Sequence, residues 1–122
     1  MTTAMQKWVI LNDLQIPWQD IPVVELVLDF VKALEPDGIV LNGDIIDFYS
    51  ISDFNKNPMT KPTLEEELTE TTELLEQLNY IPKRVFIAGN HEDRLRRYLW
   101  KHAPELVGVA GRGGGMITTC RD

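Results

Sequence analysis

The chain has 122 residues, of which 43% are hydrophobic and 25% are charged, and this composition is typical of one soluble globular domain rather than a disordered, collagenous or membrane protein. A formal net charge of −7 repels polyanions at long range and argues against non-specific binding of nucleic acid. The N-terminus lacks the features of a signal peptide, and no apolar stretch reaches the length of a membrane span, so we expect a cytoplasmic protein with no membrane partner.

The first third of the chain shows a strand, a helix and a second strand. Residues 8–11 form a short run of strand formers. Residues 21–34 carry apolar side chains at helical spacing, and Pro22 suits the first turn of that helix. The segment 35–38 breaks the helix, and residues 39–41 are an apolar run typical of a buried strand. A strand, helix and strand in this order predict a parallel connection.

The rest of the chain repeats this alternation after an irregular stretch. Residues 48–62 are rich in Asn, Ser and Pro, and we expect them to form a loop. Thr63 followed by Glu66 is the pattern of a capping box, and leucines at helical spacing follow it. Residues 85–88 are a third apolar run, and a short helix stopped by Pro104 comes next. The sequence therefore predicts an α/β fold with a parallel or mixed sheet.

Polar side chains follow each of the three predicted strands. Asp13 follows the first, Asp44 the second, and Asn90 and His91 the third. The carboxyl ends of strands meet at one edge of such a sheet, where ligands gather. Two carboxylates at that edge need a shared cation or proton, and oxygen ligands suit hard divalent metals. Asp44 has the position of a bridging ligand, and His91 that of a proton donor to a leaving oxygen.

Each of these residues also has a purely structural interpretation when it is taken alone. An aspartate at a strand end commonly caps a helix or forms a turn. The basic residues of the last helix, Arg94, Arg96, Arg97 and Lys101, suit the helix dipole without any ligand, and so does His102 near its end. We expect the three tryptophans to be core or packing residues rather than stacking platforms.

Two motifs make the chain resemble a known family. Residues 43–47, Gly-Asp-Ile-Ile-Asp, resemble the GDxxD motif, and residues 89–92, Gly-Asn-His-Glu, resemble the GNH(D/E) motif of calcineurin-like metallophosphoesterases. Residues 13–15 occupy the place of the family's DxH motif, with Gln15 where a histidine ligand is usual. The amino-acid sequence of residues 89–99 is most similar to that of phage and bacterial members of the family. The resemblance implies a four-layer αββα sandwich, with a mixed sheet flanked by helices, of which this chain is the N-terminal part.

The resemblance also implies a metal site and a reaction. Its cofactors are two divalent ions, manganese first, with iron, zinc or nickel as alternatives. The implied metal ligands are Asp13, Gln15, Asp44 and Asn90. His91 is implied to contact the phosphate and act as general acid, and Asp47 to orient His91 or a ligand. The implied reaction is hydrolysis of a phosphomonoester or phosphodiester by a hydroxide held between the two metals, with nucleic acid only as a substrate.

The family's remaining motifs leave three functions open. Members supply a further histidine and a GHxH motif from the second half of the fold, and neither is found here, since His102 is the only histidine after His91. We therefore expect residues 1–122 to be a phosphoesterase domain truncated before these motifs, possessing an incomplete or inactive site. The alternatives to an enzyme are a non-catalytic module for protein interaction, and a half-domain completed by self-association or by another chain.

Overall fold

The structure is a computed structural model that describes residues 4–57, 59 and 62–107 of the 122. The α/β class predicted from the sequence is confirmed. In chain order the elements are β1 (Trp8–Leu11), α1 (Ile21–Leu34), β2 (Gly38–Asn42), the 3₁₀ turn η1 (Tyr49–Ile51), α2 (Leu64–Gln77), β3 (Lys83–Ile87), α3 (Asp93–His102) and the 3₁₀ turn η2 (Pro104–Leu106). The last part of the predicted domain, residues 108–122, lies outside the described residues.

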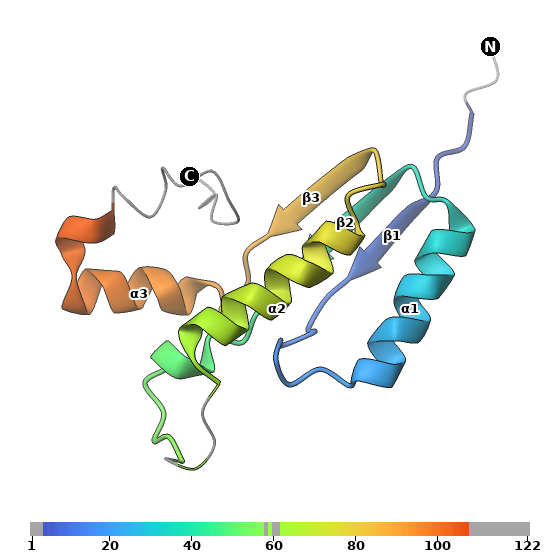
Figure 1. The fold of residues 1–122 in the computed structure, drawn as a ribbon. Helices are drawn as coiled ribbons and strands as arrows, with labels where there is room; N and C mark the ends of the chain where they lie inside the picture. Colours follow the sequence, from blue (N-terminus) through green and yellow to red (C-terminus); the bar gives the residue numbers. More distant parts are fainter. Residues whose placement is uncertain (1–3, 58, 60–61, 108–122) are drawn as a thin grey trace.

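The strands form a parallel sheet in the order β1-β2-β3 (Figure 1). Ile10 of β1 pairs with Val40 of β2, which in turn pairs with Val85 of β3. Paired residues of a parallel sheet point to the same face, so these three side chains share one face. All three strands run in the same direction, and their carboxyl ends therefore lie at one edge, as predicted.

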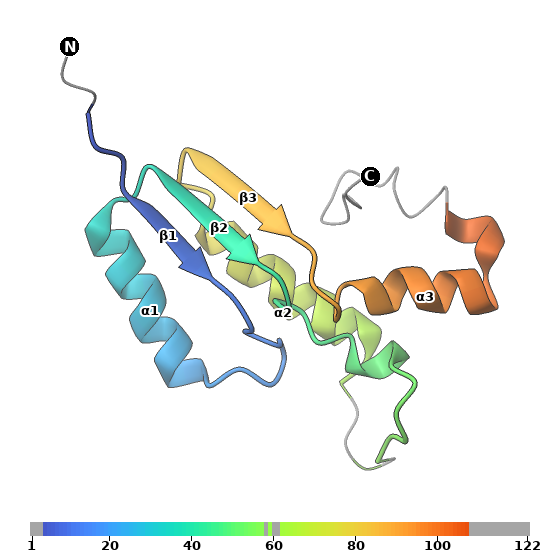
Figure 2. The same ribbon diagram turned by 180° about the vertical axis from the view of Figure 1, so that it is seen from behind.

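Helices α1 and α2 pack on the opposite face of the sheet and close the hydrophobic core. The buried cluster consists of Ile16, Val31, Ile39, Leu41, Ile45, Leu74, Leu78 and Ile81, with Val9, Leu11 and Phe86 packed against it. Figure 2, seen from behind, shows the strands unobstructed and α2 beyond them. Helix α3 lies apart from this layer, past the end of β3, in both views. The core thus lies between the sheet and the two crossover helices.

The other face of the sheet is apolar and is not covered by any described element. Ile10 is 64% exposed, Val85 44% and Ile87 42%. Trp8 belongs to the same face, and its indole lies so close over Gly38 that a Cβ at that position would be 2.4 Å from the ring. A contiguous apolar surface of this kind is typical of an interface rather than of a solvent face.

Local sequence signals fix the ends of the helices. The Asp20 carboxylate accepts a hydrogen bond from Val23 N at 3.2 Å at the start of α1. The predicted capping box of α2 is confirmed, since Thr63 Oγ1 accepts from Glu66 N at 3.1 Å and Glu66 Oε2 from Thr63 N at 2.6 Å. None of the helices in the described segments is long and apolar enough to cross a membrane.

The tryptophans, predicted to be core or packing residues, make packing contacts at exposed positions: Trp8 over Gly38, Trp18 against Tyr49 and Trp100 against Arg96. Trp8 is 42% exposed, Trp18 48% and Trp100 57%, so none of them lies in the core. Trp8 stands on the open face of the sheet, Trp18 on the loop after β1, and Trp100 on α3. Burial depends on which faces are covered in three dimensions, and the size and apolarity of a side chain do not determine that.

Candidate active site

The loops after β1 and β2 run side by side beyond the carboxyl ends of the strands. Asp13 N donates to Gly43 O at 3.1 Å, and Gln15 N donates to Asp44 O at 2.9 Å. A further parallel bridge joins Ile16 to the segment after Asp44. These backbone bonds extend the sheet pattern into the loops, so the predicted ligands from the first two strands lie next to each other.

Three of these predicted ligands have a left-handed backbone. The φ angles are 56° at Asp13, 49° at Gln15 and 53° at Asp44. This region is unfavourable for residues other than glycine, with Asp and Asn the most tolerant, and it is often occupied where a functional loop needs it. Gln15 is the least suited of the three to this conformation. The concentration of such residues at one edge supports a functional role for the two loops.

Two glycines allow the loops after β2 and β3 to approach each other closely. Gly43 has a φ of 81°, and a Cβ built on it would lie 3.1 Å from Gly89 Cα. A Cβ on Gly89 would lie 2.4 Å from Asp44 Oδ1. The glycine that precedes Asp44 and the one that precedes Asn90 are therefore needed for the same close contact, which explains why both motifs begin with glycine.

The carboxylate of Glu92 joins these loops by accepting four backbone N–H groups. Its Oε2 accepts from Asp44 N at 2.9 Å and from Gly89 N at 2.7 Å. Its Oε1 accepts from Ile45 N at 2.7 Å and from Ile46 N at 3.2 Å. Sequence reasoning included Glu92 as a residue of the GNH(D/E) motif and missed this role. The signal was present, because Glu92 is the fourth residue of the GNHE motif.

Asp44, Asp47 and His91 form a connected group across the two loops. His91 N donates to Asp44 Oδ1 at 3.0 Å, and His91 Nδ1 lies 2.9 Å from Asp47 Oδ1 and 3.1 Å from the Asp47 carbonyl oxygen. Arg94 Nη1 donates to the same carbonyl oxygen at 2.8 Å and lies 3.5 Å from Asp47 Oδ2. Asp47 is 93% buried, that is, 7% exposed, so its carboxylate is held firmly by these two partners. Sequence reasoning assigned Arg94 only to the helix dipole.

The remaining predicted ligands lie nearer the solvent. Asp13 and Asn90 are exposed, and Gln15 is partly buried. Asn12 donates a side-chain hydrogen bond to the Asp13 carboxylate, and the Asn90 carbonyl oxygen accepts from Arg97 Nη2 at 3.4 Å. Within residues 4–57, 59 and 62–107, no group of three or more His, Cys, Asp or Glu side chains is arranged to hold a metal ion. Backbone hydrogen bonds join the loops that carry Asp13, Gln15 and Asp44, and the role of these residues as metal ligands stays a prediction.

Comparison with known families gives a match between residues 7–115 and the sequence model described as calcineurin-like phosphoesterase. The chain belongs to the calcineurin-like phosphoesterase family. The resemblance inferred from the GDxxD and GNHE motifs is therefore confirmed. The chain is 33% identical over 111 residues to the Gene 54 protein of Mycobacterium phage D29, an alignment that covers 86% of the chain and 43% of the relative.

A second phage relative gives the same picture. The Gene 54 protein of Mycobacterium phage L5 is 32% identical over 108 residues, which cover 84% of this chain and 42% of the relative. The chain spans less than half the length of these curated relatives. No solved structure matches the chain. The three parallel strands and the α1 and α2 helices correspond to part of a calcineurin-like αβα fold.

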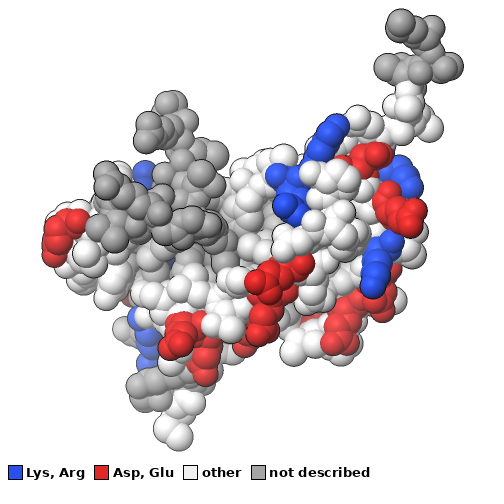
Figure 3. Space-filling model, turned by 45° about the horizontal axis from the view of Figure 1, so that its top comes forward, with Lys and Arg blue, Asp and Glu red and all other residues white. Residues whose placement is uncertain are grey.

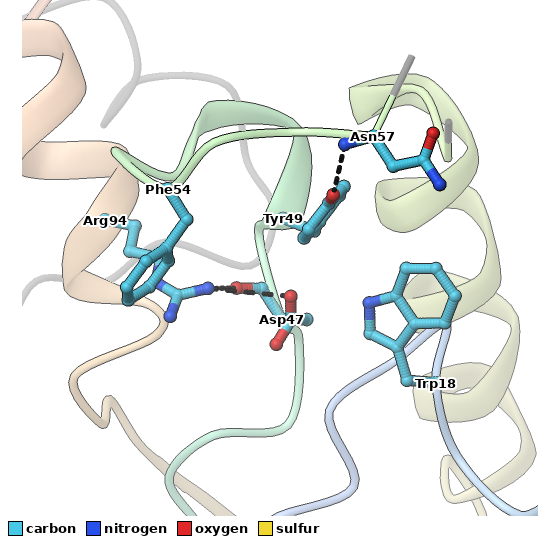
Figure 4. A pocket seen from close by; sticks show the side chains of 6 residues that line it. All are labelled: Trp18, Asp47, Tyr49, Phe54, Asn57 and Arg94. Carbon is cyan, nitrogen blue, oxygen red and sulfur yellow. Dashed lines mark hydrogen bonds and ion pairs between the residues drawn. The ribbon is translucent and has the colours of Figure 1, made fainter. Parts of the chain in front are cut away.

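A pocket of about 420 Å³ lies beside the buried Asp47 of this chain (Figure 4). Its lining residues come from three loops and the last helix: Trp18, Asp47, Tyr49, Phe54, Asn57 and Arg94. Three of the six belong to residues 48–62, where the sequence predicted an irregular loop. That segment contains η1, and no periodic pattern in the sequence indicated a pocket there.

Glu67 of α2 holds η1 in place next to the pocket. Its carboxylate accepts hydrogen bonds from Tyr49 N at 2.6 Å and from Ser50 N at 3.2 Å, as well as from the Ser50 hydroxyl. Its side chain is fully buried, and this burial raises the pKa of Glu67 above its usual value near 4.5. The bonds from Ser50 and Tyr49 lower the pKa in part, and the charge of Asp47 raises it further.

The charged surface agrees with the acidic composition of the chain. Figure 3 shows Asp and Glu side chains in several groups across one face of the molecule. On the outward side of α2 the exposed acidic residues are Glu65, Glu66, Glu70, Glu73 and Glu76. These charges disfavour the approach of a long polyanion to this side. A phosphate ester therefore needs local cations at the strand-end edge if it is to bind there.

Proposed function

We propose that this chain contributes to the active centre of a metal-dependent phosphoesterase that hydrolyses a phosphomonoester or a phosphodiester. The observation that carries the proposal is the connected group in which His91 N donates to Asp44 Oδ1 and His91 Nδ1 contacts Asp47 Oδ1. A predicted bridging ligand, a predicted proton donor and the carboxylate that orients it thus come together from two loops. Membership of the calcineurin-like phosphoesterase family supports phosphate esters as the substrate class.

The donor chemistry of the strand-end edge fits divalent metal ions as a partial site. The proposed ligands provide two carboxylates and two side-chain amides: Asp13, Asp44, Gln15 and Asn90. Such oxygen donors suit Mn²⁺ and similar hard ions. A cation shared between the two carboxylates also reduces the repulsion between them. Gly89 leaves room beside Asp44 Oδ1 that a Cβ would fill. The chemistry that two such ions supply when bound is Lewis acidity toward phosphate oxygens and water.

His91 serves as the general acid in this proposal. Two Asp47 oxygens lie within hydrogen-bond distance of its Nδ1, at 2.9 and 3.1 Å. Because both oxygens are acceptors, Nδ1 carries a proton and donates a hydrogen bond to them. When the ring is an imidazolium, both nitrogens carry a proton, and Nε2 is then the nitrogen that gives its proton to the leaving-group oxygen. Asp47 acts through His91 by fixing the ring, and Arg94 and burial keep Asp47 in position.

Hydrolysis of two aryl phosphodiesters in the presence of Mn²⁺ tests this proposal. A phenyl ester has a poor leaving group that needs a proton, whereas a 4-nitrophenyl ester needs it much less. We expect His91→Gln to lower kcat for the phenyl ester about 100-fold and for the 4-nitrophenyl ester much less. The matched control is His102→Gln, since His102 lies exposed at the end of α3 and should leave both rates unchanged. Equal effects of the two substitutions would contradict the assignment of His91.

A second candidate function is favoured by the open face of the sheet. Ile10, Val85 and Ile87 expose apolar surface there, as a half-domain completed by a second copy or by another chain would do. In this candidate the chain has no phosphoesterase activity of its own. Self-association of the chain in sedimentation experiments would favour this second function, and a monomer at all concentrations would contradict it.

A further inference from the structure

The pocket beside Asp47 has an aromatic lining that the proposed reaction does not use. Trp18 and Tyr49 meet edge to face, with ring centroids 5.6 Å apart and an angle of 86° between the rings. Phe54 stands on the other side of the pocket, where the Arg94 guanidinium lies 5.5 Å from its ring centroid (Figure 4). Trp18 is 48% exposed and Phe54 69%. Three aromatic side chains therefore border one open space.

Contact with another flat ring stabilises exposed aromatic side chains of this kind. Aromatic pairs are stabilised both by the area they bury and by the match between ring faces and edges. The edge-to-face contact between Trp18 and Tyr49 fixes the angle of the indole, so a ring that enters the pocket meets a surface that is already oriented. A flexible aliphatic chain would bury similar area but would lose more conformational freedom.

The polar groups of the pocket suit a ring that carries hydrogen-bonding atoms. Tyr49 Oη accepts from Asn57 N at 3.3 Å, and Asn57 Oδ1 accepts from Met59 N at 2.9 Å. The first bond holds the Asn57 backbone and the second its side chain, whose Nδ2 is a donor at the rim of the pocket (Figure 4). The carboxylate of Asp47 and the guanidinium of Arg94 offset each other, so the lining does not strongly repel an anionic ester.

We propose that this pocket binds a planar aromatic group of the phosphate ester, either an aryl group or a nucleobase. The inference rests on the proposed phosphoesterase function, because it names the organic part of that substrate. Asp47 belongs both to the pocket lining and to the contact with His91, whose Nδ1 is 2.9 Å away. A ring held between Trp18 and Phe54 therefore belongs to an ester whose phosphate lies next to His91.

Binding of small phosphate esters without metal tests the pocket separately from the reaction. The probes are adenosine 5′-monophosphate, phenyl phosphate and ribose 5-phosphate, titrated in EDTA and followed by ligand-observed NMR. We expect the two aromatic esters to bind about tenfold more tightly than ribose 5-phosphate, the size that stacking on aromatic side chains supports. Tighter binding of the adenosine ester than of phenyl phosphate identifies a nucleobase, and the reverse order identifies an aryl group.

Substitutions in and outside the pocket complete the experiment. Trp18→Ala should bring the affinity for the aromatic esters down to that for ribose 5-phosphate. Trp100→Ala is the matched control, because Trp100 is 57% exposed on α3 and packs on Arg96 outside the pocket. Phe54→Ala provides a second pocket variant at a still more exposed side chain, and circular dichroism checks that each variant folds.

The outcomes separate this inference from the proposed function. Equal affinity for the three esters, or unchanged affinity in both Trp18→Ala and Phe54→Ala, would overturn the pocket assignment even if the protein hydrolyses phosphodiesters. Conversely, selective binding of aromatic esters that Trp18→Ala abolishes would support the pocket even if no turnover is found, because EDTA removes any contribution from metal ions.

Discussion

Glu92 and Glu67 show two ways in which a carboxylate holds a loop of this protein in place. Glu92 accepts four backbone N–H groups from the loops after β2 and β3 and keeps partial contact with solvent. Glu67 accepts two backbone N–H groups and a hydroxyl from η1 and is fully buried. Both satisfy donors that an irregular segment leaves without strand or helix partners.

The difference between the two lies in how much the charge costs to bury. Glu92 meets more donors and stays partly hydrated, so its side chain loses less contact with water. Glu67 has fewer donors and full burial, and its pKa is raised as a result. The group that positions Asp44 and His91 therefore has the stronger anchor, and the segment that borders the pocket has the weaker one.

The largest effect is expected from Glu92→Gln. The amide keeps one acceptor oxygen and turns an NH₂ group toward N–H donors, so at least two charge-assisted hydrogen bonds are lost. We expect the free energy of unfolding to fall by about 2–4 kcal/mol. Urea unfolding followed by circular dichroism measures this change.

The control for this substitution is Glu70→Gln, since Glu70 is exposed on α2. Its effect should stay within about 0.5 kcal/mol. Comparable losses in the two variants would show that the four backbone contacts of Glu92 contribute nothing beyond a general loss of charge, and the comparison between the two anchors would then fail.

A smaller and pH-dependent effect is expected from Glu67→Gln. Because the folded-state pKa is raised, the folded protein binds more protons than the unfolded chain between the ordinary pKa of 4.5 and the folded-state pKa. Stability from this group is therefore fully present below pH 4.5 and is lost as the pH rises through the folded-state pKa. Unfolding of the wild type and of Glu67→Gln, measured from pH 4 to 8, should show the wild type losing stability relative to the variant. A difference that stays constant or grows with pH would contradict the assigned shift.

Much of the fold was predictable because its signals are local. The apolar runs of the strands, the helical spacing of 21–34 and the capping box at Thr63 each act within a few neighbouring residues. The parallel sheet then followed from the alternation of elements, and it placed Asp13, Asp44 and His91 at one edge. Their roles as ligands and general acid stay predictions.

The parts that sequence reasoning missed depend on contacts between distant segments. Glu92 reaches Asp44 across 48 positions of sequence, and Arg94 reaches Asp47 across 47. No periodic pattern marks such contacts. The pocket was missed for the same reason. The loop that carries Phe54 has neither helical nor strand spacing, and it lines a pocket only because Trp18 lies opposite in the folded chain (Figure 4).

Binding of Mn²⁺ to the chain tests the central claim most directly. Asp44→Asn removes one charge but keeps an Oδ1 acceptor for His91 N and a residue that tolerates the left-handed backbone at φ 53°. We expect calorimetry to show at least a tenfold loss of Mn²⁺ affinity in this variant, because the carboxylate proposed to bridge the metal ions is gone. Asp29→Asn, which removes one charge from the exposed side of α1, should bind as the wild type does. Equal Mn²⁺ affinity in Asp44→Asn, Asp29→Asn and the wild type would contradict the proposed site.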